Sequence, residues 1–192
     1  MLGRQVLNAP SSTTPSGPTL RVVSTPDHDR SEHPTVARVL AVLRAHGHAV
    51  EVRHLPDAVR TAKAAAEALG ITPAEIANSL VFAADAGDGT SPTPLLVLAS
   101  GGHQVDLVKV ADELELAPLR RATPEEVRTW TGFAIGGVAP VGHTSPHLRT
   151  IVDIDLARFT VVWAAAGHSH SVFATTYADL LTLTGGTPVE VV

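Results

Sequence analysis

The stretch TGFAIGGVAPVG, residues 131–142, is the most informative segment of this chain, because a glycine pair is followed by a proline turn and a further glycine. Gly136 and Gly137 can adopt backbone angles that are closed to other residues, and they let a ligand approach the main chain closely. Pro140 stiffens the same turn and has no backbone donor of its own. We therefore predict a loop that exposes main-chain groups, the glycine loop, a pattern that marks a binding site in only a minority of proteins.

Helical and strand-like patterns alternate on both sides of the glycine loop. Apolar residues recur at helical spacing from Val36 to Leu43, and Gly47 stands where that helix would end. Thr72 and Glu75 form a capping box around Pro73, which predicts a helix that ends near Asn78. Further helices are expected at 61–70, at 106–116, from 123 and at 176–183, and strands at 49–55, 79–85, 94–100, 149–155, 159–166, 171–175 and 189–192.

This order of elements favours an α+β fold, because strands occur in runs as well as between helices. We expect a mixed, largely antiparallel β-sheet or barrel with flanking helices. The chain of 192 residues with 44% hydrophobic content fits one domain, which is expected to span residues 31–192. Residues 1–30 are rich in proline, serine and threonine and are predicted to form a disordered N-terminal extension.

Composition excludes several classes of function. The chain has no cysteine, so disulfides, thiolate zinc sites and cysteine nucleophiles are excluded. No apolar run approaches the roughly 20 residues of a membrane helix, and we expect a soluble cytoplasmic protein with no membrane partner. A formal charge of -5 and a pI of about 6.0 argue against a protein that coats DNA, but they allow recognition of one RNA end.

Four segments carry a resemblance to a known family. They are TAKAAAEALG at 61–70, EIANSLVF at 75–82, the glycine loop, and VVWAAAGHSHSVF at 161–173. In this order, with PLLVLASGGHQVDLVKVADEL before the loop, the chain resembles the YbaK/ProX family of aminoacyl-tRNA deacylases over about residues 35–192. The resemblance implies a YbaK-like, aminoacyl-tRNA synthetase-associated domain that hydrolyses mischarged aminoacyl-tRNA in trans. Its partners would be the tRNA 3′ end and an aminoacyl-tRNA synthetase.

The resemblance also implies where the substrate lies. The segment Gly136–Pro140, with Gly137 and Val138 inside it, is expected to border the terminal ribose and the scissile carbonyl, and main-chain N–H groups of the glycine pair would stabilise the oxyanion. Two positions depart from the family pattern. Asn78 stands where the family has a lysine, although Ser79 keeps the following hydroxyl, and Ala165 replaces a serine two residues before Gly167.

Histidines are the candidates to compensate for these losses, because imidazole exchanges protons near neutral pH. His168 is expected to contact the attacking water or the ribose, and His54 to close another wall of the pocket. His103 and His143, like His168, also stand at loop junctions. Either the sheet brings the three histidines together in one pocket, or each is a solvated loop residue.

A metal site is not predicted. His168 and His170 are two residues apart, and His143 and His147 are four apart, but no third ligand is set by spacing. No cofactor is expected either, since the substrate ester is already activated and main-chain groups could suffice.

Carboxylate and aromatic residues have simpler interpretations. Asp153 and Asp155 are expected on a solvated strand face. Trp163 is expected in the core, whereas Trp130 would pack in the core or stack on adenine.

Three functions remain open on this basis. The first is the deacylase. A synthetase cannot reject small wrong amino acids by binding alone, so a second, hydrolytic site is needed to correct the error. The second is a binding module of the same fold for a tRNA end or a synthetase, which the absence of the lysine and the serine favours. The third is a hydrolase of another small ester.

Overall fold

Strand β2 (Ile76–Ala84) lies at the centre of the sheet, because three other strands pair with it. Strand β3 (Thr93–Ser100) runs antiparallel to β2 along almost its whole length. On the other side of β2, strand β6 (Val162–Ala165) pairs in parallel with its first residues and β4 (Leu119–Arg121) pairs antiparallel with its last. The middle of β2 therefore has a strand neighbour on one side only.

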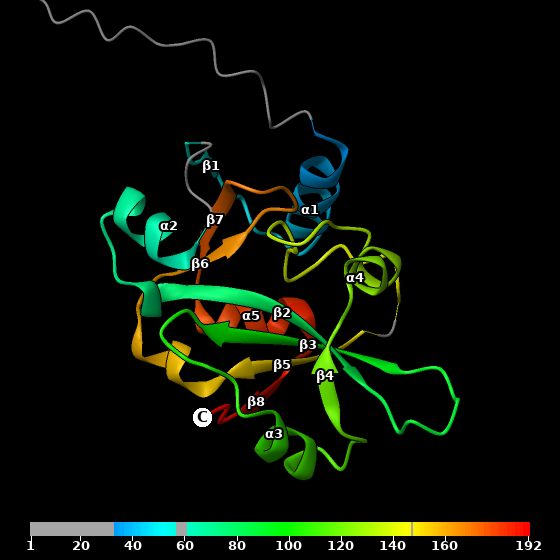
Figure 1. Cartoon of the computed structure of the whole chain (residues 1–192). Coiled ribbons are helices and arrows are strands. Elements are labelled where there is room, and N and C mark those ends of the chain that lie inside the picture. The colour runs from blue at the N-terminus through cyan, green and yellow to red at the C-terminus, as the bar shows by residue number, and fades with distance from the viewer. Residues whose placement is uncertain (1–32, 57–60, 147) are drawn as a thin grey trace, which may run out of the picture.

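The structure is a computed structural model that describes residues 33–56, 61–146 and 148–192 (Figure 1). The predicted disordered extension, residues 1–30, lies outside the described residues. Within the described ranges, no helix is both long and apolar enough to span a membrane.

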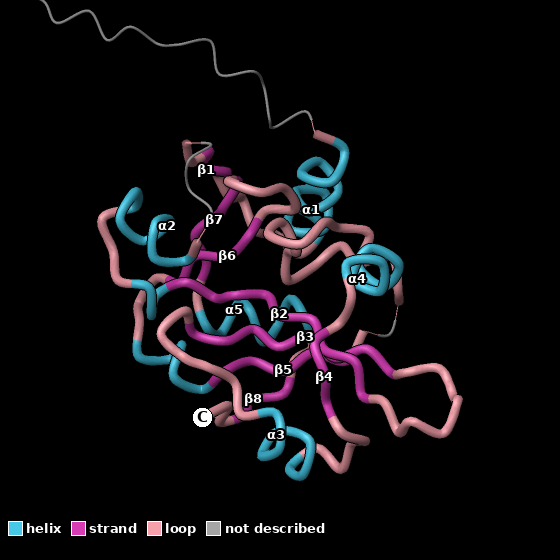
Figure 2. Tube along the Cα trace, in the orientation of Figure 1, coloured by secondary structure: helices cyan, strands magenta, loops and turns pink. Residues whose placement is uncertain are grey.

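The strands of the described residues form one sheet in the order β1-β7-β6-β2-β3-β5-β8, with β4 attached to β2 (Figure 2). Four of its strand pairs are antiparallel and three are parallel. The predicted α+β fold with a mixed, largely antiparallel sheet is therefore confirmed, and β1 and β8 are the edges of an open sheet instead of a barrel. The remaining strands are β1 (Val52–His54), β5 (Arg149–Asp153), β7 (Ser171–Thr175) and β8 (Thr187–Val189).

Local capping explains where most helices begin. The side chains of Thr61, Thr123 and Thr176 each accept a hydrogen bond from a backbone N–H of the first turn, and the Asp106 carboxylate accepts two. Each satisfies donors that the first turn leaves free. The α-helices of the described residues are α1 (Pro34–Ala45), α2 (Ala62–Leu69), α3 (Leu107–Glu113), α4 (Pro124–Thr131) and α5 (Tyr177–Thr184), and the 3-10 helices are η2 (Pro73–Glu75) and η3 (Ile154–Arg158).

The prediction of a helix ending near Asn78 is wrong. The Glu75 carboxylate does accept from the N–H and the hydroxyl of Thr72, at 2.8 and 2.9 Å, but only the single turn η2 follows. Strand β2 begins at Ile76, whose neighbour Ala77 lies between Ser100 of β3 and Ala164 of β6. Pairing on both sides outweighs the local start signal, so Asn78 is a strand residue.

Side chains of the sheet face three apolar clusters. The main cluster joins Ala77 and Val81 of β2 to helices α1, α4 and α5 and to the glycine loop. A second cluster on the opposite face holds Phe82 and packs against α3, and a third joins Ile76 and Trp163 to α2. The predicted burial of Trp163 is thereby confirmed, whereas Trp130 packs partly buried against the main cluster.

Candidate functional site

The glycine loop is closed at its base by main-chain hydrogen bonds. The N–H of Thr144 donates to the carbonyl of Thr131 at 3.3 Å, and the N–H of Ser145 donates to that of Trp130 at 3.0 Å. Inside the loop, the side chains of Phe133, Val138, Ala139 and Val141 are buried in the main cluster. Apolar anchoring on one side and closure at the base hold the loop in one shape, which is what a site built from main-chain groups requires.

The tip of the glycine loop is open to solvent. Gly136 has φ of +87°, and no atom lies within 4 Å of the position that a Cβ would occupy there. Ile135 beside it is 61% exposed. The N–H of Gly137 is already bonded to the carbonyl of Ala134 at 3.0 Å. Among the described residues, the N–H groups of Gly136 and Val138 have no hydrogen-bond acceptor.

Arg38 of α1 secures the start of the glycine loop. Its Nη2 donates to the carbonyl of Gly132 at 3.2 Å, and its guanidinium lies 4.5 Å from the centre of the Phe133 ring. Its Nε is buried without a partner among the described residues. This arrangement makes the cation part of the loop's support.

His143 supports the same loop from its other end. Its Nε2 lies 2.8 Å from the carbonyl oxygen of Ala139, and its ring meets the Phe133 ring edge-on at 6.0 Å. Burial is the main cause that lowers the pKa of His143, and the nearby charge of Arg38 lowers it further. Because a carbonyl only accepts, Nε2 of His143 carries a proton and donates to the loop.

The turn after β6 packs directly on the glycine loop. A Cβ at Gly137 would lie 2.8 Å from the carbonyl carbon of His168 and 2.9 Å from the nitrogen of Ser169. Only glycine fits there without displacing backbone. The same turn is fastened to α1, because the Thr35 hydroxyl donates to the carbonyl of Gly167. The structure thus brings together Gly137, His168 and Gly167, which the sequence placed in one candidate site.

The ring of His168 is oriented by two contacts. Its Nδ1 lies 2.7 Å from the carbonyl oxygen of Ser169, and its ring centre lies 4.6 Å from that of His33. Because a carbonyl only accepts, Nδ1 carries the proton. In the neutral ring Nε2 is then an acceptor, and it has no partner among the described residues.

Asn78 and Ala165 lie side by side on the face of the sheet that Trp163 occupies. Ala77 pairs with Ala164, so the next residue of each strand is again a neighbour, and alternation turns both side chains to the Ile76 and Trp163 side. Val172 and then Arg53 continue this row through β7 and β1. The guanidinium of Arg53 lies 4.9 Å from the centre of the Trp163 ring.

Ser79 and His54 face the other way. Ser79 is on the main-cluster face, and its Oγ is buried without a partner among the described residues. His54 lies opposite Ser171, with its Nδ1 3.1 Å from the Ser171 hydroxyl. Asn78 and Ser79 therefore point to opposite faces of the sheet, as adjacent strand residues do.

His103 belongs to a different group of side chains. Its Nδ1 lies 2.7 Å from a carboxylate oxygen of Asp153, and its Nε2 lies 3.3 Å from one of Asp155. Asp153 is only 1% exposed and also accepts from the N–H of Ser100 at 2.9 Å. The predicted solvated position of Asp153 is therefore wrong. His143 and His168 both contact the glycine loop, but the contacts of His103 place it with β5 and η3.

Sequence reasoning did not place Arg53 in the site. The pattern of segment 49–55 does not indicate that Arg53 contacts Trp163, because the two residues are more than a hundred positions apart in the chain. Within the described ranges, no group of three or more histidine and acidic side chains is arranged to hold a metal ion. The cavities include one of about 320 Å³ between α1 and α5 and one of about 300 Å³ beside α4, and neither is lined by the candidate site residues.

Comparisons with known proteins point in one direction. Residues 56–183 match the family described as the aminoacyl-tRNA editing domain. The chain is 31% identical over 130 residues to the uncharacterized protein YwhH of Bacillus subtilis, which covers 68% of this chain and 78% of that protein. It is 33% identical over 98 residues to proline–tRNA ligase of Burkholderia thailandensis, which covers 51% of this chain and only 17% of the ligase.

Solved structures show the same likeness. A candidate trans-editing enzyme for prolyl tRNA synthetase is 42% identical with a TM-score of 0.72, and the match covers 82% of this chain and 96% of that one. The hypothetical protein APE2540 shares the fold, with a TM-score of 0.71 at 24% identity over 80% of this chain and 98% of that one.

Proposed function

Because the chain belongs to the aminoacyl-tRNA editing domain family, we propose that it hydrolyses the ester bond of a mischarged aminoacyl-tRNA. Action in trans is supported by the likeness to a candidate trans-editing enzyme, of which the match covers 96%. Charged tRNA is the cytoplasmic substrate of translation, so the proposed site of action is the cytoplasm.

The observation that carries this proposal is the contact between the glycine loop and the turn that holds His168. Hydrolysis of an ester needs donors for the developing oxyanion and a group that orients water. The free N–H groups of Gly136 and Val138 are the proposed donors. Two neighbouring residues hold these donors in place. Pro140 stiffens the turn, and Gly137 allows it to pack closely against the His168 turn.

The proposed reaction is direct attack by water. Nε2 of His168 accepts a proton from water as the water oxygen bonds to the ester carbonyl carbon. The bond between that carbon and the ribose oxygen then breaks, and the ribose oxygen takes the proton. The products are a free amino acid and a tRNA with a free terminal hydroxyl. The reaction as proposed uses neither a metal nor a cofactor.

The face that carries Asn78 is the proposed cradle of the tRNA 3′ end. Asn78 offers amide hydrogen bonds without charge, and the small side chain of Ala165 leaves space beside it. Arg53 on the same face supplies a positive charge, and its stacking on Trp163 holds the guanidinium ready for a phosphate. Gly167 would contribute main-chain contacts. Ser79 and His54 would support this face from behind.

A second candidate is a binding module that holds the tRNA end or a synthetase without turnover. Asn78 and Ala165 favour it, because neither side chain can supply the charge or the hydroxyl of the family pattern. A hydrolase of another small ester would share the loop but not the dependence on RNA.

Deacylation of purified aminoacyl-tRNAs tests these alternatives. The panel consists of the tRNA for proline charged with alanine and its counterparts charged with cysteine or serine. Each substrate is tested with and without a chelator. Multiple turnovers that the chelator does not reduce would support the proposal and name the amino acid. Binding of RNA without release from any substrate would support the binding module instead. Release from a minimal ester that lacks adenosine would indicate the third function.

A further inference from the structure

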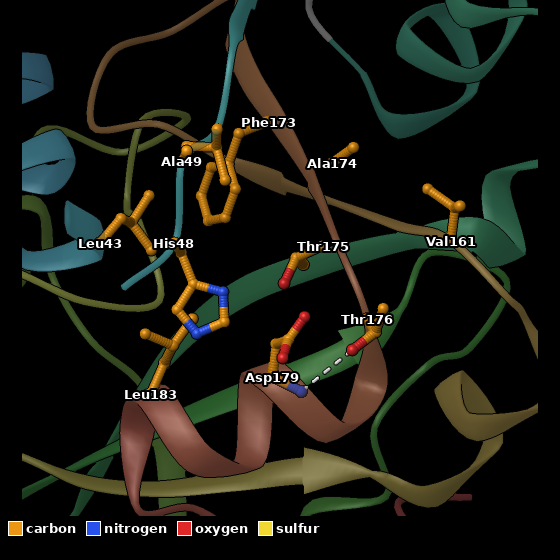
Figure 3. Close-up of a pocket in the computed structure, with 11 residues that line it drawn as sticks. Leu43, His48, Ala49, Val161, Phe173, Ala174, Thr175, Thr176, Asp179 and Leu183 are labelled. Atoms are coloured by element: carbon orange, nitrogen blue, oxygen red, sulfur yellow. Dashed lines mark hydrogen bonds between the residues drawn. The ribbon is translucent and has the colours of Figure 1, made fainter. Parts of the chain in front are cut away.

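A groove lies between the end of α1, the end of β7 and the start of α5 (Figure 3). Its volume is about 320 Å³. We call it the α1–α5 groove. None of the residues assigned to the proposed tRNA site lines it, so what it binds is independent of the proposed function.

The groove joins an apolar floor to three polar side chains. Leu43, Phe173 and Leu183 form the floor and are buried. His48 lies in the loop after α1, Thr175 in β7 and Asp179 in α5, and their side chains point toward a common space (Figure 3). A pocket with apolar walls and a few convergent polar groups is the usual form of a small-molecule site.

Thr175 adds a hydroxyl group to the same space. The residue is only 9% exposed, and its side chain points into the groove (Figure 3). Its hydroxyl has no hydrogen-bond partner among the described residues and is not one of their fully buried polar atoms. The hydroxyl can therefore bond to water or to a ligand that enters the groove.

Asp179 sets the charge of the ligand. Its backbone N–H donates to the Thr176 hydroxyl at 3.1 Å, but its carboxylate has neither an ion pair nor a hydrogen bond within the described parts of the chain. The described residues that line the groove include no lysine or arginine. A carboxylate beside a hydroxyl and an imidazole offers acceptors to a cation with several donors, and a primary ammonium group has three.

We propose that the α1–α5 groove binds a small primary ammonium compound with a short branched aliphatic group. The ammonium group lies between the Asp179 carboxylate, the Thr175 hydroxyl and the imidazole of His48. The aliphatic group lies on Leu43, Phe173 and Leu183. The groove volume of about 320 Å³ lies at the lower end of the range of about 300–1,000 Å³ for small-molecule pockets.

The test uses isopentylamine and its neutral counterpart isopentanol as probes. Each is titrated into the full chain while backbone amide signals are followed by NMR. We expect isopentylamine to shift signals of residues 48–50, 173–176 and 179–183 with a Kd of about millimolar order, and isopentanol to bind at least about tenfold more weakly. Equal binding of the two probes, or no shift at these residues up to about 50 mM amine, would overturn the proposal.

Matched variants separate the groove from general charge effects. Asp179→Asn should weaken amine binding about tenfold or more, whereas Asp112→Asn, which removes an exposed charge on α3, should leave it unchanged. Thr175→Val should also weaken amine binding, whereas Thr175→Ser, which keeps the hydroxyl, should bind the amine like the wild type. An equal loss in Asp179→Asn and Asp112→Asn, or full binding by Thr175→Val, would overturn the proposed contacts. Thermal unfolding of each variant shows that the fold is retained.

Discussion

Gly137 packs against the backbone of His168 so closely that a Cβ at position 137 would lie 2.8 Å from the His168 carbonyl carbon. The contact is between two main chains, and neither can move as easily as the end of a side chain. It couples the loop that would bind the oxyanion to the turn that would orient water. The proposed site therefore depends on the absence of a side chain at one position.

Gly137→Ala tests this contact directly. We expect the free energy of unfolding to fall by about 1–3 kcal/mol, because the added methyl group must displace backbone. We expect kcat/KM for deacylation to fall about 100-fold, since a shift of about 1 Å misplaces the proposed donors. Urea unfolding and steady-state kinetics measure the two effects.

Gly136→Ala is the control for Gly137→Ala. Its φ of +87° makes alanine unfavourable by about 1–2 kcal/mol, but no atom lies within 4 Å of the new methyl group. A larger loss of stability in Gly136→Ala than in Gly137→Ala would show that backbone strain, and not the contact with His168, governs this loop.

His168→Ala tests the proposed general base. We expect the single-turnover rate to fall by about 10²–10⁴-fold, the usual range for such a group, with little change in tRNA affinity. His33→Ala removes the neighbouring ring and should reduce the rate much less, because His33 contacts only one side of His168. An unchanged rate in His168→Ala would assign water activation to another group, such as a hydroxyl of the tRNA.

Arg53→Ala tests the proposed phosphate contact. We expect KM to rise about tenfold with kcat nearly unchanged, because the proposed role of the guanidinium is to bind a phosphate and not to take part in the reaction. The slope of log affinity against log salt should become shallower by about 0.7, the value for one single-strand phosphate contact. Arg44→Ala, which removes an exposed cation at the end of α1, should leave the slope as it is. Equal slopes for wild type and Arg53→Ala would remove Arg53 from the RNA site.

The partly buried ring of His143 predicts a pH dependence of stability. Burial lowers the pKa of His143 in the folded protein, so the unfolded chain binds this proton more tightly. The free energy of unfolding should therefore fall as the pH drops through the unfolded pKa of about 6.5, and the loss should level off below the folded pKa. Each unit between the two pKa values is worth about 1.4 kcal/mol.

His143→Gln should reduce this pH dependence, since glutamine can still donate to the Ala139 carbonyl but does not titrate. Urea unfolding between pH 5 and 7 measures the difference. His46→Gln, at an exposed position after α1, serves as the matched control. If both variants keep the wild-type pH profile, His143 is not the titrating group.

Local chemistry explains which elements the sequence predicted correctly. Thr61, Thr123 and Thr176 begin helices through hydrogen bonds to residues three positions ahead, and Gly70 ends one in the left-handed conformation. The position of the glycine loop follows from its own glycine and proline residues, whereas Arg38 and His143 support its shape from outside. The local interactions span a few residues, so the order of residue types is sufficient to indicate them.

Contacts between distant segments explain the errors. The capping box at Thr72 and Glu75 forms, but pairing of β2 with β3 and β6 ends the helix after one turn. Asp153 is buried because His103 and the N–H of Ser100 both bind it. Neither contact leaves a local pattern in the chain.

The sequence by itself determined the class of fold, the glycine loop and the family, because these depend on local propensities and on the order of motifs. Only the tertiary structure decided which candidate residues share a face. Asn78 lies with Ala165 and Arg53, whereas Ser79 and His54 lie behind them, because strand register turns adjacent residues to opposite sides. That register is set by the hydrogen bonds and packing of strands far apart in the chain.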